Sequence, residues 1–460
     1  MIAASERFDA VVVGGGTAGA WAAASLARRG ATVALVDARP LDEAGARWVN
    51  GVPLWMYEAA GLPAPKAPEL RPTGRFGIRV VGGELPRRFL EPNPIRQIDV
   101  RHLVARLHDL GAKAGVRQFA PARVVDTDFD PDGRLRRVGI ELEAGGTRLL
   151  QGRLFVDASG FGGVLRRRVP RLAESCPKPA REDTCSAAQA VYEIDDLGAA
   201  KEWLAAEGLR SLDTDCRLSG NGGYSTDNVA VDLATREVEF LTGVIADGAH
   251  GDGPSVIEAR RREVGFSGAQ IFGGQGVIPL RRPYDRLAAD GVALIGNAAC
   301  QVFAAHGSGT GSGMIAARLL ADVVTRHDDP GGREALWDYQ CRYMRRWGGL
   351  LASYDLVRRF SQRLVPGEVT ALLGGGLLST DSQARALDQR MPRLLRSDLM
   401  RSGVALARAP WMGPVVAEGL GAIPFVAMHY RVYPERPRGR MLRRWSRIAA
   451  RLRGDAADPV

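Results

Sequence analysis

Three glycines near the N-terminus have the spacing of a phosphate-binding turn. They follow the apolar run 8–13, typical of a buried strand, and precede the apolar segment 20–26, typical of a helix. Glycine allows a tight turn and lets backbone N–H groups approach a pyrophosphate, and the start of the following helix favours negative charge. The residues expected to contact a dinucleotide here are Gly14, Gly16, Thr17, Ala18 and Gly19.

An acidic residue stands where such a turn needs a partner for a ribose. A second apolar run, 32–36, ends at Asp37. A carboxylate at this place accepts hydrogen bonds from the adenosine ribose hydroxyls and repels a 2′-phosphate. The strand, turn, helix, second strand and terminal acid together predict that the chain binds FAD or NAD.

Length and composition are those of an enzyme with a large core. The 460 residues are 45% hydrophobic, and this length suggests two or three lobes. The first apolar run is the nucleotide-binding strand itself, so no signal peptide is expected, and no stretch reaches the ~18 uninterrupted apolar residues of a membrane span. Five cysteines without a CxxC pair favour a reducing compartment, and no Cys/His cluster predicts a metal site. We expect a cytoplasmic protein.

The net charge of +10 comes almost wholly from arginine. Nucleic-acid binding would require basic residues interleaved with exposed aromatic residues, and the chain has no such patch. The charge therefore does not predict a nucleic-acid partner.

The remaining pattern predicts an α/β protein. Helical spacing over 98–114 precedes strand-like segments from 122 to 156, and a late apolar strand, 291–296, leads through glycines into a helix at 314–325. Alternation over 229–244 indicates an antiparallel sheet. We expect a Rossmann-like FAD-binding domain (1–60, 98–170 and 281–335), an inserted antiparallel-sheet substrate domain (61–97 and 171–280) and a helical C-terminal extension (336–460).

This order of motifs resembles the FAD-binding fold shared by aromatic hydroxylases, geranylgeranyl reductases and flavin-dependent halogenases. The resemblance covers residues 1–335 and implies one extended FAD. By position it implies that Arg47 and Arg101 make polar contacts to the cofactor, with a solvated surface role as the alternative for each, and that Val124 adjoins the adenine. Gly296 and Asn297 stand where the family has Gly-Asp, so Asn297 is expected to bond the ribityl chain without carrying a charge.

The glycine-rich loop 304–314 predicts a cradle for a flat ring. A helix beginning near Ser312, with Gly311 and Gly313 beside it, would direct backbone N–H groups at the flavin and stabilise the negative charge of its reduced form. His306 in this loop is a candidate acid, base or stacking residue, and a structural role is the alternative.

Two segments resemble halogenase landmarks and depart from them. Arg75 occupies the place of the essential lysine, and Gly274 and Gly276 occupy the two tryptophan positions of WxWxIP. An always-protonated arginine is a poor substitute for that lysine, so Arg75 is a candidate catalytic residue without its halogenase role. The DASG string at 157–160 replaces the Asp-Gly of the hydroxylases, which suggests a separate flavin reductase or electron carrier.

These observations predict an FAD-dependent oxidoreductase that acts on a bulky hydrophobic or aromatic small molecule. Monooxygenation is the main interpretation. The alternatives are reduction of isoprenoid-like double bonds, halogenation, and a non-redox cyclase or isomerase reaction.

The C-terminal segment 439–453 predicts a basic amphipathic helix. Its apolar positions recur at helical spacing and arginines fill the other face. Contact with an anionic membrane surface is one interpretation, and packing on its own domain, with the arginines in water, is the other.

Overall fold

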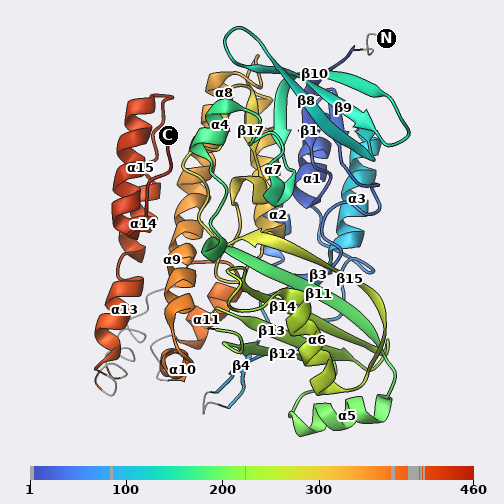
Figure 1. The fold of residues 1–460 in the computed structure, drawn as a ribbon, viewed down its shortest axis with the longest axis vertical. Coiled ribbons are helices and arrows are strands. Elements are labelled where there is room, and N and C mark those ends of the chain that lie inside the picture. The colour runs from blue at the N-terminus through green and yellow to red at the C-terminus, as the bar shows by residue number, and fades with distance from the viewer. Residues whose placement is uncertain are drawn as a thin grey trace.

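Two β-sheets lie one above the other along the long axis of the molecule, and a column of helices runs along one side (Figure 1). The computed structural model describes residues 5–82, 86–222, 224–374, 379–391, 404, 407 and 410–460. The rest of the expected C-terminal extension, 375–378 and most of 392–409, lies outside the described residues. The expected fold class, a Rossmann-like core with a second sheet and C-terminal helices, is confirmed.

The first sheet has eight strands and a parallel centre. Its strands are β1 (Ser5–Val13), β2 (Val33–Val36), β7 (Arg117–Phe119), β8 (Ala122–Phe129), β9 (Leu135–Leu142), β10 (Thr147–Asp157), β16 (Ala288–Ala289) and β17 (Val292–Leu294). The order is β16, β17, β10, β1, β2, β7, with the β8–β9 hairpin joined to β10. β1 pairs in parallel with β2 and β10, and all of β2 is buried, which explains its continuous apolar sequence.

Helices cover this sheet at close range. They are α1 (Thr17–Ala27), α3 (Val100–Lys113), α7 (Thr310–Val324) and α8 (Arg333–Tyr343). α1 packs against both α3 and α7, and nearly all of its residues are buried. Its small alanine and glycine residues permit this close approach. Because α1 is buried on nearly all sides, its sequence shows little amphipathic pattern.

The second sheet has seven strands in the order β15, β11, β14, β13, β12, β4, β5. Their bounds are β4 (Phe76–Val80), β5 (Arg88–Leu90), β11 (Thr184–Ile194), β12 (Thr214–Leu218), β13 (Thr226–Asp232), β14 (Glu237–Ile245) and β15 (Ser267–Pro279). All neighbouring pairs are antiparallel except β4 and β12.

The two faces of this sheet have different partners. Val229, Val231, Val238 and Phe240 point to a core made with α5 (Leu197–Ala206) and α6 (Gly253–Val264). The alternate residues of the same strands face a cavity beneath the helical column. Because side chains alternate along a strand, one set of alternate residues belongs to the core and the other set belongs to the cavity wall.

The remaining elements connect the sheets and build the column. They are β3 (Val49–Val52), α2 (Trp55–Ala59), β6 (Arg96–Asp99), α4 (Pro170–Ser175), α9 (Gly349–Arg363), α10 (Pro366–Gly374), α11 (Thr380–Leu387), α13 (Met412–Leu420), α14 (Ile423–Tyr430) and α15 (Gly439–Arg453). A π-helical turn, Met344–Gly348, joins α8 to α9. β3 pairs with β6 between the two larger sheets.

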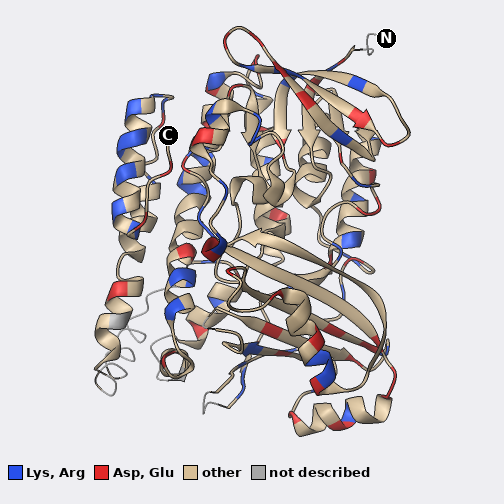
Figure 2. Ribbon diagram, viewed as in Figure 1, with Lys and Arg blue, Asp and Glu red and all other residues tan. Residues whose placement is uncertain are grey.

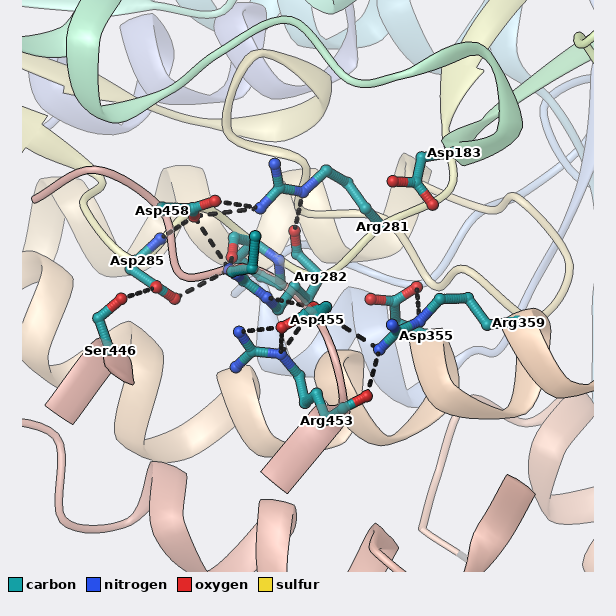
Figure 3. Close-up of polar contacts among 12 residues, drawn as sticks. Asp183, Arg281, Arg282, Asp285, Asp355, Arg359, Ser446, Arg453, Asp455 and Asp458 are labelled. Carbon is teal, nitrogen blue, oxygen red and sulfur yellow. Dashed lines mark hydrogen bonds and ion pairs between the residues drawn. The ribbon is translucent and has the colours of Figure 1, made fainter. Parts of the chain in front are cut away.

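A buried polar network fastens the C-terminal tail to the body (Figure 3). Arg282 is 1% exposed, and its Nη1 lies 2.9 Å from Oδ1 of Asp285 and 2.9 Å from Oδ2 of Asp458. Arg281 also bonds Asp458, and Ser446 of α15 bonds Asp285. The paired guanidiniums hold the pKa of Asp458 far below its usual range despite its burial.

The outer helices expose both arginine and apolar side chains. Blue positions gather along α15 in Figure 2, where the exposed arginines are Arg440, Arg443, Arg444, Arg447 and Arg451. The inner face of α15 packs on the body through Leu442, Trp445 and Ala449, as the domain-packing interpretation expects. Along α13 and α14, Met412–Tyr430 is long and apolar enough to cross a membrane by length and composition, and 12% of that stretch is buried.

Candidate flavin and substrate site

The turn between β1 and α1 has a geometry that only glycine allows. Gly14 has φ +106°, and a Cβ there would lie 2.3 Å from the carbonyl oxygen of Ala158. A Cβ on Gly19 would lie 1.8 Å from the carbonyl oxygen of Gly14. The turn therefore lies at backbone distance from the residues after β10 and from the first turn of α1, and Gly14, Gly16 and Thr17 line a groove.

Asp37 closes β2 beside this turn. Its Oδ2 accepts a hydrogen bond from the backbone N–H of Gly15 at 2.6 Å, and its Oδ1 accepts one from Arg39 at 2.8 Å. The carboxylate thus lies against the glycine turn, at the carboxyl end of a central strand, where nucleotides bind in this class of sheet.

A groove of about 620 Å³ runs past both features; we call it the flavin groove. Its wall includes eight of the residues predicted to bind the cofactor: Gly14, Gly16, Thr17, Ala18, Asp37, Val124, Gly296 and Asn297. The groove reaches from the end of β2 to the start of α7, so it joins the two segments that the family resemblance predicts one extended FAD to contact.

Four further predicted residues lie directly behind the wall. Gly19 lies beneath the glycine turn, and a Cβ on Gly313 would lie 3.1 Å from Cβ of Ala18. Gly311 packs against Met56, where a Cβ would lie 2.3 Å from the sulfur. Ser312 donates a hydrogen bond to the carbonyl of Gln301 at 2.6 Å. These residues shape the groove through α1 and α7 rather than lining it.

Cationic side chains that the sequence did not single out also line the flavin groove. They are Arg39, Arg123, Arg167 and Arg168. Arg168 is held by the carbonyls of Val124 and Val164 at 3.1 and 3.0 Å. The four guanidiniums and the glycine cradle suit a pyrophosphate. α7 begins at Thr310 in the groove wall, and its N-terminus suits an electron-rich ring. The residues present fit FAD.

Three predicted arginines have other partners. Arg101 lies 3.3 Å above the Phe272 ring and its Nη2 lies 2.6 Å from Oδ2 of Asp99. Arg47 donates to the carbonyl of Asp42 at 2.8 Å, and neither side chain is part of the groove wall.

Arg75 lies farther from the groove. It pairs with Asp213 and stacks 3.8 Å from the Phe89 ring centroid, and it lines neither the flavin groove nor the cavity below it. The Asp213 carboxylate and the Phe89 ring hold its guanidinium. Arg75 therefore joins the start of β4 to the turn before β12.

A second cavity, of about 370 Å³, adjoins the flavin groove; we call it the apolar cavity. Its walls are the free face of the second sheet and helices α9, α10, α11 and α13. Asn50 of β3 lines both spaces, and its amide donates to the Thr310 hydroxyl at 3.2 Å. The two spaces therefore meet at β3 and the start of α7.

His306 faces the apolar cavity at this junction, and its neighbour Gly307 faces the flavin groove. The imidazole lies 4.7 Å from the Phe303 ring centroid, and its Nε2 has no hydrogen-bond partner among the described residues. Burial lowers the pKa of His306 to about 4, so the ring is neutral at physiological pH. A ring that stays neutral suits stacking or accepting a hydrogen bond.

The two glycines at halogenase tryptophan positions lie on β15. A Cβ on Gly276 would lie 3.7 Å from the Trp48 ring, and one on Gly274 would lie 3.7 Å from Cβ of Arg47. Trp48 and Gly276 both line the flavin groove. The segment before β3 therefore occupies part of the space that the absent tryptophans leave.

Comparison with known proteins agrees with this geometry. Residues 9–168 match the family model described as FAD dependent oxidoreductase. The chain is 25% identical over 368 residues to the digeranylgeranylglycerophospholipid reductase of Sulfolobus acidocaldarius, covering 78% of each chain.

Solved structures share the fold. A geranylgeranyl bacteriochlorophyll reductase-like protein from Thermoplasma acidophilum superimposes with a TM-score of 0.69 at 16% identity, covering 91% of this chain and 100% of that one. The myxobacterial chondrochloren halogenase gives a TM-score of 0.59 at 17% identity, covering 95% of this chain and 99% of that one. The chain is an FAD-dependent oxidoreductase, and it is similar in sequence motifs and in fold to this superfamily.

Proposed function

We propose that this FAD-dependent oxidoreductase reduces carbon–carbon double bonds in a long isoprenoid chain. The observation that carries the proposal is the apolar cavity that meets the flavin groove at Asn50. A substrate chain lying in this cavity would present a double bond to the flavin ring at the junction.

The wall of the apolar cavity suits an uncharged hydrocarbon. Its large aliphatic and phenyl side chains include Phe76, Ile78, Leu218, Leu241, Val357, Phe360, Leu364, Leu372 and Leu420, and its polar ones are mostly uncharged. Among its described lining residues none is Lys or Arg, and Glu239 is the one carboxylate. Burying an isoprenoid here would release about 0.8 kcal/mol per CH₂ group from the hydrophobic effect.

Reduction is favoured over monooxygenation by the relatives that match most of the chain. The Sulfolobus relative is named as a reductase of a geranylgeranyl lipid, and it aligns over 78% of this chain. The monooxygenase interpretation is supported by the fold alone, which hydroxylases and halogenases share. We therefore take reduction as the function and oxygenation as the competing outcome of the test.

The chain's own residues would bind and orient the reactants. We assign the glycine turn, Asp37 and Asn297 to FAD binding, and Asn50 and His306 to the substrate side of the ring. When bound, reduced FAD supplies the electron pair and one hydrogen for the double bond. We propose that a separate flavin reductase or electron carrier restores the reduced form, since no second glycine turn for a nicotinamide domain is present in the sequence.

We also propose that the enzyme works at an anionic membrane surface. On α14 and just after it, Phe425, Met428 and Val432 share one face and are 59%, 65% and 63% exposed. The exposed arginines of α15 lie on the neighbouring helix, and each is worth about 1 kcal/mol near an anionic leaflet. α13, the helix that precedes α14 in the chain, contributes Leu420 to the wall of the apolar cavity.

The function is tested by anaerobic incubation of the reduced enzyme with a geranylgeranyl lipid, followed by mass spectrometry of the product. We expect a gain of one hydrogen molecule per reduced double bond. A product that gains oxygen, and only in air, would instead establish a monooxygenase.

Membrane contact is tested by sedimentation with phosphatidylglycerol vesicles. The triple variant R443Q/R444Q/R447Q should bind these vesicles at least ~10-fold more weakly, whereas R136Q/R137Q/R148Q, with the same charge loss on the first sheet, should bind as the unmodified protein does. Equal binding by both variants would refute the contact.

A further inference from the structure

Glu239 is the one carboxylate in the described wall of the apolar cavity. It lies on β14 and points to the cavity face of the sheet, opposite Val238 and Phe240 in the core. Leu241, two residues along, shares that face. A carboxylate in an apolar wall costs free energy unless it is paired, hydrogen-bonded or protonated.

A hydrogen-bonded link joins Glu239 to the junction of the two spaces. Its Oε1 accepts a hydrogen bond from Nε2 of Gln189 at 2.6 Å. The same amide bonds Val49 of β3 through both its backbone groups, with 2.9 Å from Nε2 to the carbonyl oxygen. Val49 precedes Asn50, the residue that lines both spaces, so Glu239 lies one side chain from β3 on the substrate side.

A second, small cavity also touches Glu239; we call it the small polar cavity because four charged side chains line it. It measures about 30 Å³, these side chains are Arg71, Asp232, Glu237 and Glu239, and Pro72, Gln97, Leu212, Ala230 and Val231 complete its wall. Arg71 forms an ion pair with Glu237 there, and both side chains are about one-fifth exposed, at 20% and 22%. A space of this size with several polar partners has room for a water molecule, which would give Glu239 a route for exchanging a proton with solvent.

The charge balance around Glu239 keeps a proton available. Burial raises the pKa of Glu239 to about 7, and the negative charges of Asp99 and Glu237 act in the same direction, while Arg71 and the Gln189 hydrogen bond oppose them. A carboxylic acid with a pKa near the working pH is suited to donating a proton and recovering it.

We propose that Glu239 is the proton donor in double-bond reduction. One carbon of the double bond receives the electron pair and a hydrogen from reduced FAD, and the other carbon takes the proton of Glu239. The double bond becomes a single bond, FAD is left oxidised and Glu239 is left as a carboxylate. Solvent returns the proton through the small polar cavity. This role rests on the proposed function.

The test compares Glu239→Gln with Glu239→Asp and with Glu193→Gln. Glutamine keeps the size and the hydrogen bond to Gln189 but cannot release a proton. We expect kcat to fall by at least ~100-fold in E239Q with KM within about two-fold, and to recover partly in E239D. Glu193 is an exposed glutamate of the adjacent strand β11, and E193Q should behave as the unmodified enzyme does.

The pH dependence gives a second readout. kcat of the unmodified enzyme should fall as the pH rises through about 7, because the acid form is the active one, and this limb should be absent in E239Q. Unchanged kcat in E239Q, or a raised KM with kcat intact, would overturn the role.

An infrared readout separates this proposal from the proposed function. The protonated carboxyl band should lose intensity between pH about 6 and about 8, and the loss should be smaller in E239Q by the share of one carboxyl, because Asp227, whose pKa burial also raises to about 7, titrates in both proteins. If the enzyme reduces the lipid but E239Q and the unmodified protein lose the same intensity, the role of Glu239 fails alone. If the two losses differ but no isoprenoid is reduced, the proposed function fails and this role fails with it.

Discussion

The amide of Asn50 donates a hydrogen bond to the hydroxyl of Thr310 at 3.2 Å, where the apolar cavity meets the flavin groove. This bond ties β3 to the first residue of α7, whose N-terminus faces the flavin groove. Asn50 therefore belongs to both the cofactor side and the substrate side of the site.

Replacing Asn50 with alanine tests this position. Loss of the bond to Thr310 should loosen the junction and lower kcat by about 3- to 10-fold, in line with one hydrogen bond. FAD affinity should change less, because the glycine turn and the arginines are untouched. Steady-state kinetics and flavin titration of Asn50→Ala measure the two effects, and a loss of flavin with unchanged kcat would contradict the assignment.

The glycine turn makes a sharper prediction. In Gly19→Ala the new Cβ would lie 1.8 Å from the carbonyl oxygen of Gly14, so the turn must distort. We expect the protein to lose its bound flavin and ~2 kcal/mol or more of stability. Flavin absorbance per protein and urea unfolding measure both losses.

Gly367→Ala is the matched control, because a Cβ there meets nothing within 4 Å. If G19A kept its flavin as well as G367A does, the groove beside β1 would not be the cofactor site.

The part of the site predicted from sequence is the part whose chemistry is local. A strand, a glycine turn, a helix and Asp37 follow one another within a short segment, so spacing alone indicates their geometry. Arg39, Arg123, Arg167 and Arg168 meet only after folding, and no local pattern marks them as one cluster.

A position carried over from a family resemblance does not fix the partner of its side chain, because another carboxylate in the fold can pair with it. Arg101 pairs with Asp99, and Arg75 pairs with Asp213, which lies far along the chain. Their roles, like the expected domain boundaries and His306 in catalysis, stay predictions.

Glu239 shows a third limit on what a sequence pattern can predict about the site. Strand alternation predicts that it faces away from the core of the second sheet, but α9, α10 and α11 decide that this face becomes a cavity wall rather than solvent-exposed surface. The exposed apolar face of α14 was missed for a related reason. Periodicity identifies a helix and its apolar face but does not show whether another element covers that face.

The buried network at the C-terminus predicts a large effect of Asp458→Ala. Removing this carboxylate leaves Arg281 and Arg282 buried with less compensation, and breaking a buried pair from one side costs ~3–5 kcal/mol. Urea unfolding should show a lower midpoint than that of Glu418→Ala, a carboxylate whose side chain is 79% exposed. Equal midpoints would contradict a structural role for the network.

His306 predicts a change in stability with pH. Its pKa of about 4 in the folded protein lies below the ordinary value of 6.5, so folding disfavours the protonated ring. The stability that the neutral ring allows above pH 6.5 is lost as the pH falls toward 4. At pH about 5 the loss should be roughly 1–2 kcal/mol.

Thermal unfolding at neutral and acid pH measures this effect. His306→Gln should lose less stability on acidification than the unmodified protein, whereas His102→Gln, at an exposed position on α3, should lose as much. Identical pH dependence of H306Q and the unmodified protein would show that His306 is solvated.

The central claim is that electrons pass from the flavin to a double bond held in the apolar cavity. The most direct measurement is the absorbance of oxidised flavin after anaerobic mixing of the reduced enzyme with a geranylgeranyl lipid. We predict that the absorbance returns without oxygen, in proportion to the double bonds reduced. A flavin that stays reduced with the lipid and reoxidises only when air is admitted would contradict the account.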